Sequence, residues 1–204
     1  MDHETLEEMT HTMEPYIPKN ARLLDLMSGS NTYVPKVSII QKAVGVGLSA
    51  PELGRNINLN SHVVQDLNSK PALPFKPYSF DIITVISGMS YVEHPTMFFR
   101  QAADVLKPGG TIFIAFSNEV YKNEATEEWY NMTPEDRLSK VVSCLAKSRQ
   151  FSKKDIKVIT LKASRSNDPK RDVHIVIGVK KVHNLGSSQK PTVSKRTSAI
   201  KSSQ

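Results

Sequence analysis

Between residues 19 and 181, short apolar runs alternate with segments in which apolar residues recur at helical spacing. The short runs predict β-strands, because apolar runs of four to eight residues between turn-forming residues are typical of buried strands. The predicted strands are Arg22–Met27, Lys42–Leu48, His62–Asp66, Phe80–Ile86, Thr111–Phe116, Asp155–Leu161 and Val173–Val179. A polar loop joins the last two strands, so we expect them to form an antiparallel pair.

The clearest helical pattern covers Pro95–Leu106, and the segment Lys107-Pro108-Gly109-Gly110 is expected to end this helix. A second helix is expected to begin at Thr133, which is a good N-cap residue, with Pro134 in its first turn. Its apolar residues share one face: Leu138, Val141, Val142 and Leu145.

The remaining segments are less regular. Tyr33–Gln41 predicts a short helix, and Pro51 suits the first turn of another. Leu67–Ser79 is interrupted by prolines and is expected to be a loop. The alternation predicts an α/β fold: a single Rossmann-like domain with a mostly parallel twisted sheet of about seven strands, helices on both faces and a late antiparallel pair. Ligands of such sheets bind beyond the carboxyl ends of the strands.

The two ends of the chain differ in charge. Residues 1–18 predict a short acidic N-terminal helix or leader, because the first 17 residues carry five acidic side chains and no Lys or Arg. Residues 182–204 carry four Lys or Arg and no acid, and their Ser-rich composition predicts a basic disordered tail. With a net charge of +7, the body and tail fit either an anionic partner such as RNA or simply a well-solvated surface.

Several classes of protein are excluded by composition. No apolar run approaches the length of about 18 residues that a membrane-spanning helix needs, so no membrane association is expected. The single cysteine, Cys144, excludes an intramolecular disulfide, and the six histidines lack metal-binding spacing, so no metal is expected. A reducing compartment is the simplest expectation, either the cytoplasm or the nucleus.

Small and acidic residues stand at the predicted strand ends. The first strand ends in LDLMSGSN, and its small residues allow a ligand to approach the backbone closely. Asp25 precedes this turn and either accepts a hydrogen bond from a ligand or fixes the loop. Asp66 ends the third strand and either binds a ligand or caps a turn, which is the more frequent role of such an aspartate.

Four segments together resemble a known family: LLDLMSGS, AVGVGLSAPEL, VVQDLNSKPALPFKPYSFDIIT and DVLKPGGTIFIAFSN. In their order and spacing they are similar to the class I S-adenosylmethionine-dependent methyltransferases, and most similar to the type 11 group. The resemblance covers residues 20–120 and implies a methyltransferase-like domain over residues 19–181 with S-adenosylmethionine as cofactor.

The resemblance also implies roles for individual residues. Asp25, Ser28 and Gly29 would line the methionine end of the cofactor. Gly47 and Leu48 would flank the ribose and adenine, Asp66 and Leu67 would meet the adenine edge, and Ser87 would lie beside the methionine moiety.

Two departures from the family pattern affect the expected cofactor site. The first loop of the family is usually D-x-G-x-G-x-G, whereas here Met27 and Asn31 replace two of the glycines. Gly47 replaces the acidic residue that usually binds both ribose hydroxyls. Losing such hydrogen bonds costs about 1.5–3 kcal/mol, or roughly ten- to a hundredfold in affinity.

Methyl transfer by this family implies in-line attack of a nucleophile on a sulfonium methyl, in which alignment supplies much of the acceleration. The acceptor is not identified. Tyr91, His94 and Asn118 are candidates for a base, and none is assigned as catalytic.

Other interpretations remain open. The main one is a catalytically inactive methyltransferase-like scaffold, associated with RNA or a protein complex. Since the short N-terminal leader leaves little to cover the pocket, a partner chain could complete it. Residues Gly45–Ala50 also match a dinucleotide fingerprint, G-x-G-x-x-A, although these glycines fall inside a predicted strand.

Overall fold

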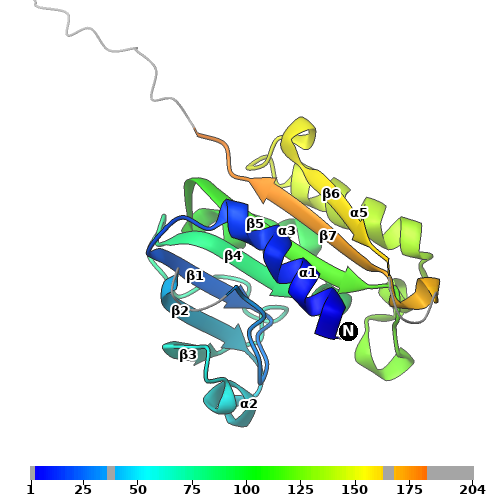
Figure 1. Cartoon of the computed structure of the whole chain (residues 1–204), viewed down its shortest axis with the longest axis horizontal. Helices are drawn as coiled ribbons and strands as arrows, with labels where there is room; N and C mark the ends of the chain where they lie inside the picture. The colour runs from blue at the N-terminus through cyan, green and yellow to red at the C-terminus, as the bar shows by residue number, and fades with distance from the viewer. Residues whose placement is uncertain (1–2, 36–39, 163–167, 183–204) are drawn as a thin grey trace, which may run out of the picture.

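A computed structural model describes residues 3–35, 40–162 and 168–182. In this part of the chain, seven strands form one sheet in the order β3-β2-β1-β4-β5-β7-β6 (Figure 1). The strands are β1 (Ala21–Leu26), β2 (Ile40–Gly47), β3 (Ser61–Val64), β4 (Phe80–Ile86), β5 (Leu106–Ser117), β6 (Lys157–Leu161) and β7 (Val173–Val179).

The sheet is mostly parallel. Strands β1 to β5 pair in parallel, whereas β7 lies between β5 and β6 and runs antiparallel to both. The register places Phe113 of β5 opposite Ile177 of β7. The predicted fold class is therefore confirmed, including the late antiparallel pair.

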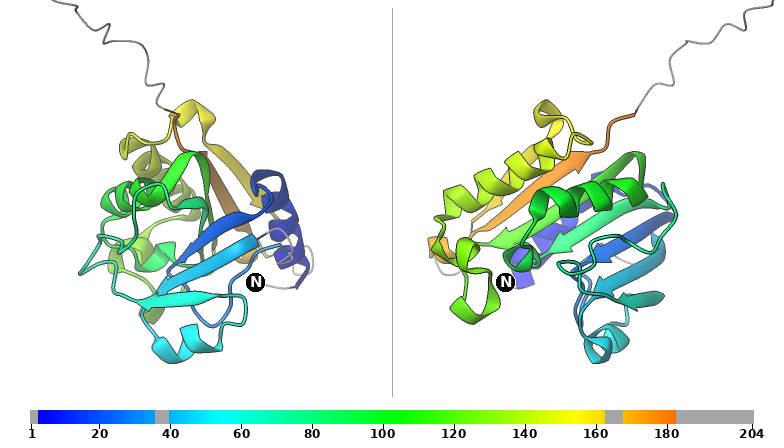
Figure 2. Two further views of the ribbon diagram at one scale, coloured as in Figure 1. Left: turned by 90° about the vertical axis from the view of Figure 1, so that its left-hand side faces the viewer. Right: turned by 180° about the vertical axis from the view of Figure 1, so that it is seen from behind.

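Helices cover both faces of the sheet (Figure 2). The α-helices of the described residues are α1 (His3–Met13), α2 (Ala50–Arg55), α3 (Pro95–Val105), α4 (Glu127–Asn131) and α5 (Pro134–Lys147). Helix α1 crosses one face, and α3 and α5 lie together on the other. The start of α5 is as predicted, because the Thr133 hydroxyl accepts the backbone N–H of Asp136 at 3.1 Å.

Each face has its own apolar core. Met9 and Met13 of α1 are fully buried and pack with side chains of the sheet such as Phe113. On the other face, Phe99 of α3 and Leu145 of α5 are fully buried in a second cluster. Burying a side chain of this size contributes about 1.5–3 kcal/mol, so α1 is part of the folded core.

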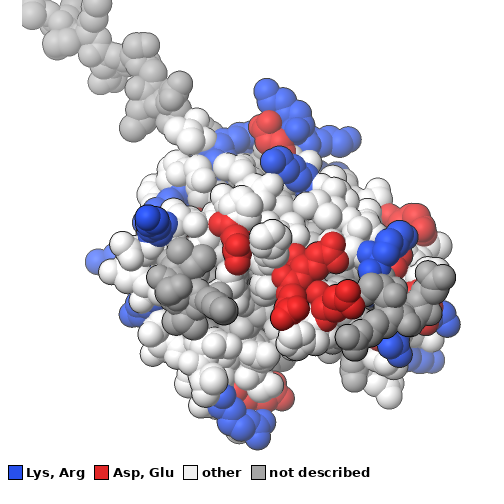
Figure 3. Space-filling model, in the orientation of Figure 1, with Lys and Arg blue, Asp and Glu red and all other residues white. Residues whose placement is uncertain are grey.

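Acidic side chains gather on the outer surface of α1 (Figure 3). Glu4, Glu7 and Glu8 of this helix are exposed, whereas its methionines face the sheet. The helix is therefore amphipathic, as the spacing of its methionines indicates.

One predicted helix is wrong in the part that the structure describes. Residues 33–35 of the expected helix Tyr33–Gln41 are irregular, Ile40 and Gln41 belong to β2, and residues 36–39 lie outside the described residues. Pro35 disfavours a helical conformation at Val34. In addition, Asn58 donates a hydrogen bond to the Thr32 carbonyl at 3.2 Å. This contact holds Thr32, the residue directly before the expected helix, in an irregular loop.

Strand boundaries also differ from the prediction: β2 begins at Ile40, β3 ends at Val64 and β6 begins at Lys157, and the largest difference is at β5. The structure begins β5 at Leu106, directly after α3, whereas the sequence predicted a turn at residues 107–110 and a strand from Thr111. The pairing of β5 with β4 is irregular between Phe80 and Ile82, so the extra residues join the strand through a break in register. Gly109, with φ of 77°, lies in this segment.

The order of the strands creates a crevice at one edge of the sheet. From β1 the chain passes to β2 and β3 on one side, and then returns to β4 on the other side of β1. A ligand site is expected at the carboxyl ends of the strands where the order reverses. No helix of the described residues is both long and apolar enough to cross a membrane. The predicted tail, apart from Val182, lies outside the described residues.

Candidate functional site

A cavity of about 610 Å³ opens where β1, β2, β3 and β4 end. Seven of the eight residues that the sequence singled out line it: Ser28, Gly29, Gly47, Leu48, Asp66, Leu67 and Ser87. These residues come from four separate strand ends, so the fold brings together what the sequence spreads over 60 residues.

Asp25 is the exception, because it lies beneath the cavity. It is 4% exposed and accepts hydrogen bonds from the hydroxyls of Ser28 (2.7 Å), Thr32 (2.8 Å) and Thr84 (2.7 Å). Burial raises the pKa of Asp25 above its ordinary value of 3.8, although these hydrogen bonds oppose the shift. Of the two roles that the sequence suggested, the geometry gives Asp25 the second: it fixes the loop after β1.

This loop lies directly on the end of β2. The backbone N–H of Ser28 donates to the Val46 carbonyl at 2.9 Å. A Cβ atom at Gly47 would overlap the carbonyl oxygen of Ser28, so no side chain fits at residue 47. The close approach of the two backbones explains why glycine stands where the family usually has an acidic residue.

Met27 leaves the cavity open. Its φ of 58° lies in the left-handed region, and its side chain packs against Gly88, where an added Cβ would overlap it. Ser87 has the same φ of 58° on the neighbouring strand end. Two residues that line the cavity are thus held in a conformation that costs about 1–2 kcal/mol for a residue with a side chain.

The far wall of the cavity is tied together by Asn68. The carboxylate of Asp66 accepts the backbone N–H of Asn68 at 2.9 Å, which lowers the pKa of Asp66. The Asn68 amide donates to the Tyr91 carbonyl at 2.8 Å and accepts the N–H of Glu93 at 3.1 Å. Asp66 therefore caps a turn and also presents an ionised carboxylate to the cavity.

The wall is acidic although the chain is basic. Three carboxylates line the cavity, those of Glu52, Asp66 and Glu93, and no Lys or Arg is among the lining residues. Such a wall favours a ligand that carries a positive charge. Neither Glu52 nor Glu93 was predicted from the sequence, since an acid in the first turn of a helix and an acid in a loop carry no signal of their own.

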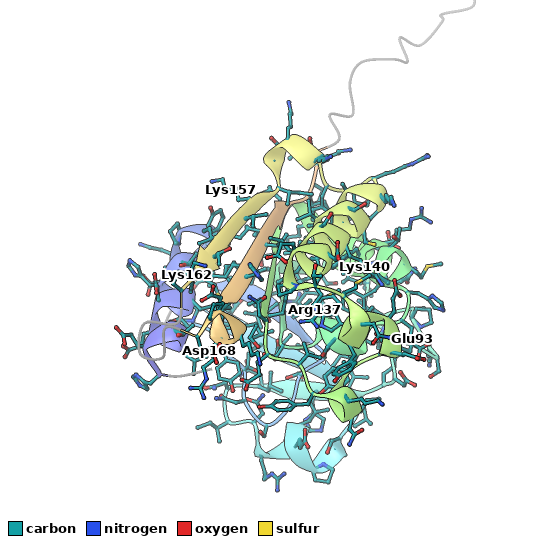
Figure 4. All side chains as sticks on the ribbon, turned by 90° about the vertical axis from the view of Figure 1, so that its right-hand side faces the viewer. Glu93, Arg137, Lys140, Lys157, Lys162 and Asp168 are labelled. Carbon is teal, nitrogen blue, oxygen red and sulfur yellow. The ribbon has the colours of Figure 1, made fainter. Side chains whose placement is uncertain are left out.

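A second cavity, of about 290 Å³, shares Ser87 and Tyr91 with the first. Three aromatic residues line it, Phe116, Tyr121 and Trp129, together with the polar residues Ser90, Ser117 and Glu119. Arg137, labelled in Figure 4, holds Trp129 by donating to its backbone carbonyl at 2.9 Å. The two cavities are therefore neighbours, with Ser87 and Tyr91 between them.

Of the three candidate bases, only Tyr91 lies at these cavities. His94 lines a separate small cavity of about 30 Å³. Asn118 hydrogen-bonds to the His174 ring at 2.8 Å and to the Pro169 carbonyl at 2.9 Å, so it has a structural role. Among the described residues, no group of three His, Cys, Asp or Glu side chains is arranged to hold a metal ion.

The first cavity fits an adenosyl sulfonium. Its volume is in the range of about 300–1,000 Å³ that small-molecule sites have. Leu48 and Leu67 supply apolar walls, and the backbone at Ser28-Gly29 is accessible. The carboxylates suit the net positive charge of S-adenosylmethionine.

Comparison with known proteins places the chain in a family. A family model described as "Methyltransferase domain" matches residues 1–161, and the chain belongs to this family. Among curated relatives, the ubiquinone/menaquinone biosynthesis C-methyltransferase UbiE of Pectobacterium atrosepticum is 30% identical over 121 residues, which are 54% of this chain and 48% of the relative. The ubiquinone biosynthesis O-methyltransferase of Idiomarina loihiensis is 28% identical over 102 residues, which are 50% of this chain and 40% of the relative. The chain thus spans about half the length of the curated relatives it matches.

Solved structures share the fold. An S-adenosylmethionine-dependent methyltransferase from Mesorhizobium loti has a TM-score of 0.60 and 18% identity, over 85% of this chain and 96% of that one. A chain in a complex of the Haloferax volcanii Trm112 methyltransferase activator with a methyltransferase has a TM-score of 0.58 and 17% identity, over 88% of this chain and 93% of that one. The class I methyltransferase fold predicted from the sequence is confirmed.

Proposed function

We propose that this protein transfers a methyl group from S-adenosylmethionine to an acceptor that enters through the second cavity. The observation that carries the proposal is the first cavity itself. It lies at the point where the strand order reverses, and seven residues that the family resemblance assigns to the cofactor line it together.

Residues of the first cavity would bind the cofactor, and residues between the two cavities would orient the acceptor. When bound, the cofactor supplies a methyl group on a good leaving group, so the protein must mainly align the reactants. The backbone at Ser28-Gly29 would receive the methionine end, and Asp66 with Leu67 would receive the adenine. Ser87 and Tyr91 stand where the cavities meet, and there they would orient the acceptor toward the methyl group.

The test is calorimetric titration of the full chain with S-adenosylhomocysteine. We expect saturable heat, and we expect Asp66→Ala to weaken binding about tenfold, the loss of a hydrogen bond to a charged group. Glu8→Ala is the matched control, because Glu8 is an exposed carboxylate on α1 that does not line the cavity. Absence of heat at millimolar ligand would instead support the inactive scaffold, which is compatible with the replacements at Met27 and Gly47.

Partners beyond the acceptor are also proposals. One structural neighbour comes from a complex with an activator protein, which supports a protein partner for this chain as well. The basic residues after Val182 support an anionic partner such as RNA in the cytoplasm or nucleus. Deleting residues 183–204 should then lower RNA affinity and flatten its dependence on salt, and an unchanged salt slope would contradict this role.

A further inference from the structure

The carboxylate of Glu52 on α2 faces the loop after β1, beside the residue that lacks the usual acid of the family. We propose that Glu52 binds the two ribose hydroxyls of the cofactor in place of the missing carboxylate at residue 47. This inference rests on the proposed function, because it assumes that the first cavity holds a nucleoside.

A carboxylate cannot return to its usual place in this chain. Any side chain at Gly47 would overlap the carbonyl oxygen of Ser28, which lies on the end of β2. The loop and the strand end are held together by the hydrogen bond from the Ser28 N–H to the Val46 carbonyl. Ribose recognition by a charged acceptor therefore has to come from another residue of the same wall.

Glu52 is within reach of that wall. Helix α2 begins at Ala50, directly after β2, and the Glu52 side chain lines the cavity together with Gly29 and Gly47. Its Oε2 atom lies 3.5 Å from the position that a Cβ of Gly29 would occupy. The carboxylate thus borders the loop from the α2 side, next to the end of β2.

The position of Glu52 is fixed by its helix. Asn56, which follows α2 and is 4% exposed, donates hydrogen bonds to the Gly29 carbonyl at 3.0 Å and to the Thr32 hydroxyl at 2.8 Å. Leu53 is 1% exposed and anchors the helix in the core. The helix and the loop therefore form one unit, which holds the backbone of Glu52 beside Gly29, while its exposed side chain is free to turn toward a ligand.

The other two carboxylates of the cavity are less suited to the task. Asp66 already accepts the N–H of Asn68, and Glu93 belongs to the segment after β4, which is tied to Asn68 rather than to the loop after β1. Glu52 forms no ion pair with a described residue. A carboxylate has two oxygens and can accept both hydroxyls of a vicinal diol through charge-assisted hydrogen bonds.

The experiment compares two ligands, S-adenosylhomocysteine and its 2′,3′-dideoxy analogue, by calorimetry. Wild-type protein should prefer the hydroxylated ligand by about 10- to 100-fold. Glu52→Gln should lose this preference and bind both ligands alike. Glu93→Gln removes the same charge from the same cavity, and it should keep the preference while lowering the affinity for both ligands equally. Thermal unfolding of each variant checks that it is folded.

The outcomes separate this inference from the proposed function. If Glu52→Gln keeps the preference, or if wild-type protein binds both ligands equally, the role of Glu52 is wrong while the cofactor site stands. If Glu93→Gln loses the preference as fully as Glu52→Gln, the effect is one of general charge and the inference is overturned. If wild-type protein binds neither ligand, the proposed function fails and the role of Glu52 fails with it.

Discussion

Met27 has a backbone conformation that glycine prefers, and it stands where the first loop of the family has a glycine. Its side chain compensates in part by packing against the core cluster that contains Phe99. The backbone conformation of Met27 lowers the stability of the fold, whereas the packing of its side chain raises it. A pair of substitutions can separate the two effects.

We expect Met27→Gly to be more stable than Met27→Ala by about 1 kcal/mol, the reverse of the usual order, because both variants lose the side chain but only glycine tolerates a φ of 58°. Urea denaturation of the two variants measures the difference directly. A more stable alanine variant would show that the loop does not hold this conformation in solution.

Asp25 predicts a pH dependence of stability with a defined sign. Its pKa is higher in the folded protein than the ordinary value of 3.8, so the folded state holds the proton more tightly than the unfolded state. This contribution favours folding below pH 3.8 and is lost as the pH rises through the folded pKa. The unfolding free energy of Asp25→Asn should therefore improve relative to wild type as the pH rises through this window.

Asp66→Asn is the matched variant, because the pKa of Asp66 is shifted in the opposite direction and its stability should therefore change with pH in the opposite sense. Hydrogen bonding lowers the pKa of Asp66, so its contribution is present above 3.8 and is lost as the pH falls. Relative to wild type, Asp66→Asn should lose stability as the pH rises. Denaturation curves of both variants across the same pH series should diverge in opposite directions, and parallel curves would contradict the assigned environments.

Single residues of the site were predictable to different degrees. Ser28, Gly47 and Asp66 were predicted because each lies at or directly after the end of a predicted strand, and the ends of parallel strands meet at one edge. Glu52 was not, because its position beside Gly29 depends on how α2 folds back on the loop. That path is set by Asn56, whose partners lie more than 20 residues away in the sequence.

At the scale of elements, the loop after β1, the end of β2 and helix α2 act as one unit. We expect Gly47→Asp, which restores the usual acid of the family, to lower stability by about 1–3 kcal/mol, since it forces the Ser28 carbonyl away from the strand. It should also weaken S-adenosylhomocysteine binding. Gly54→Asp is the control, because nothing lies within 4 Å of a Cβ at Gly54.

The two glycine variants are compared by thermal unfolding and calorimetry. Gly54→Asp should resemble wild type in both measurements. If Gly47→Asp were instead as stable as wild type and bound the ligand more tightly, the loop would have room for a carboxylate and the explanation for Gly47 would be wrong.

Elements with a strong pattern were predicted correctly, whereas those defined by tertiary contacts were not. Helix α5 was predicted from Thr133 and Pro134 because capping is a local interaction. The expected helix at Tyr33–Gln41 is not found in its described residues, because side chains distant in sequence, such as Asn58, hold the backbone at Thr32 in a loop. The early start of β5 depends on a break in register with β4, which no local pattern reveals.

At the scale of the whole molecule, the alternation of strands and helices was enough to predict the sheet and the edge that carries the site. It did not predict that β7 would lie between β5 and β6, because strand order depends on packing rather than on sequence order. Nor did a net charge of +7 indicate that the cavity wall would be acidic. The fold decides where the charged side chains lie, so the net charge of the whole chain does not predict the charge of one cavity.

The most direct test of the central claim is an amide NMR titration of the full chain with S-adenosylhomocysteine. We predict saturable shifts confined to backbone amides around the first cavity, including those of Ser28, Gly29, Gly47 and Leu67, with little change along β6. Amides that do not respond at millimolar ligand, or that respond only away from the strand ends, would contradict the claim that this cavity binds the cofactor.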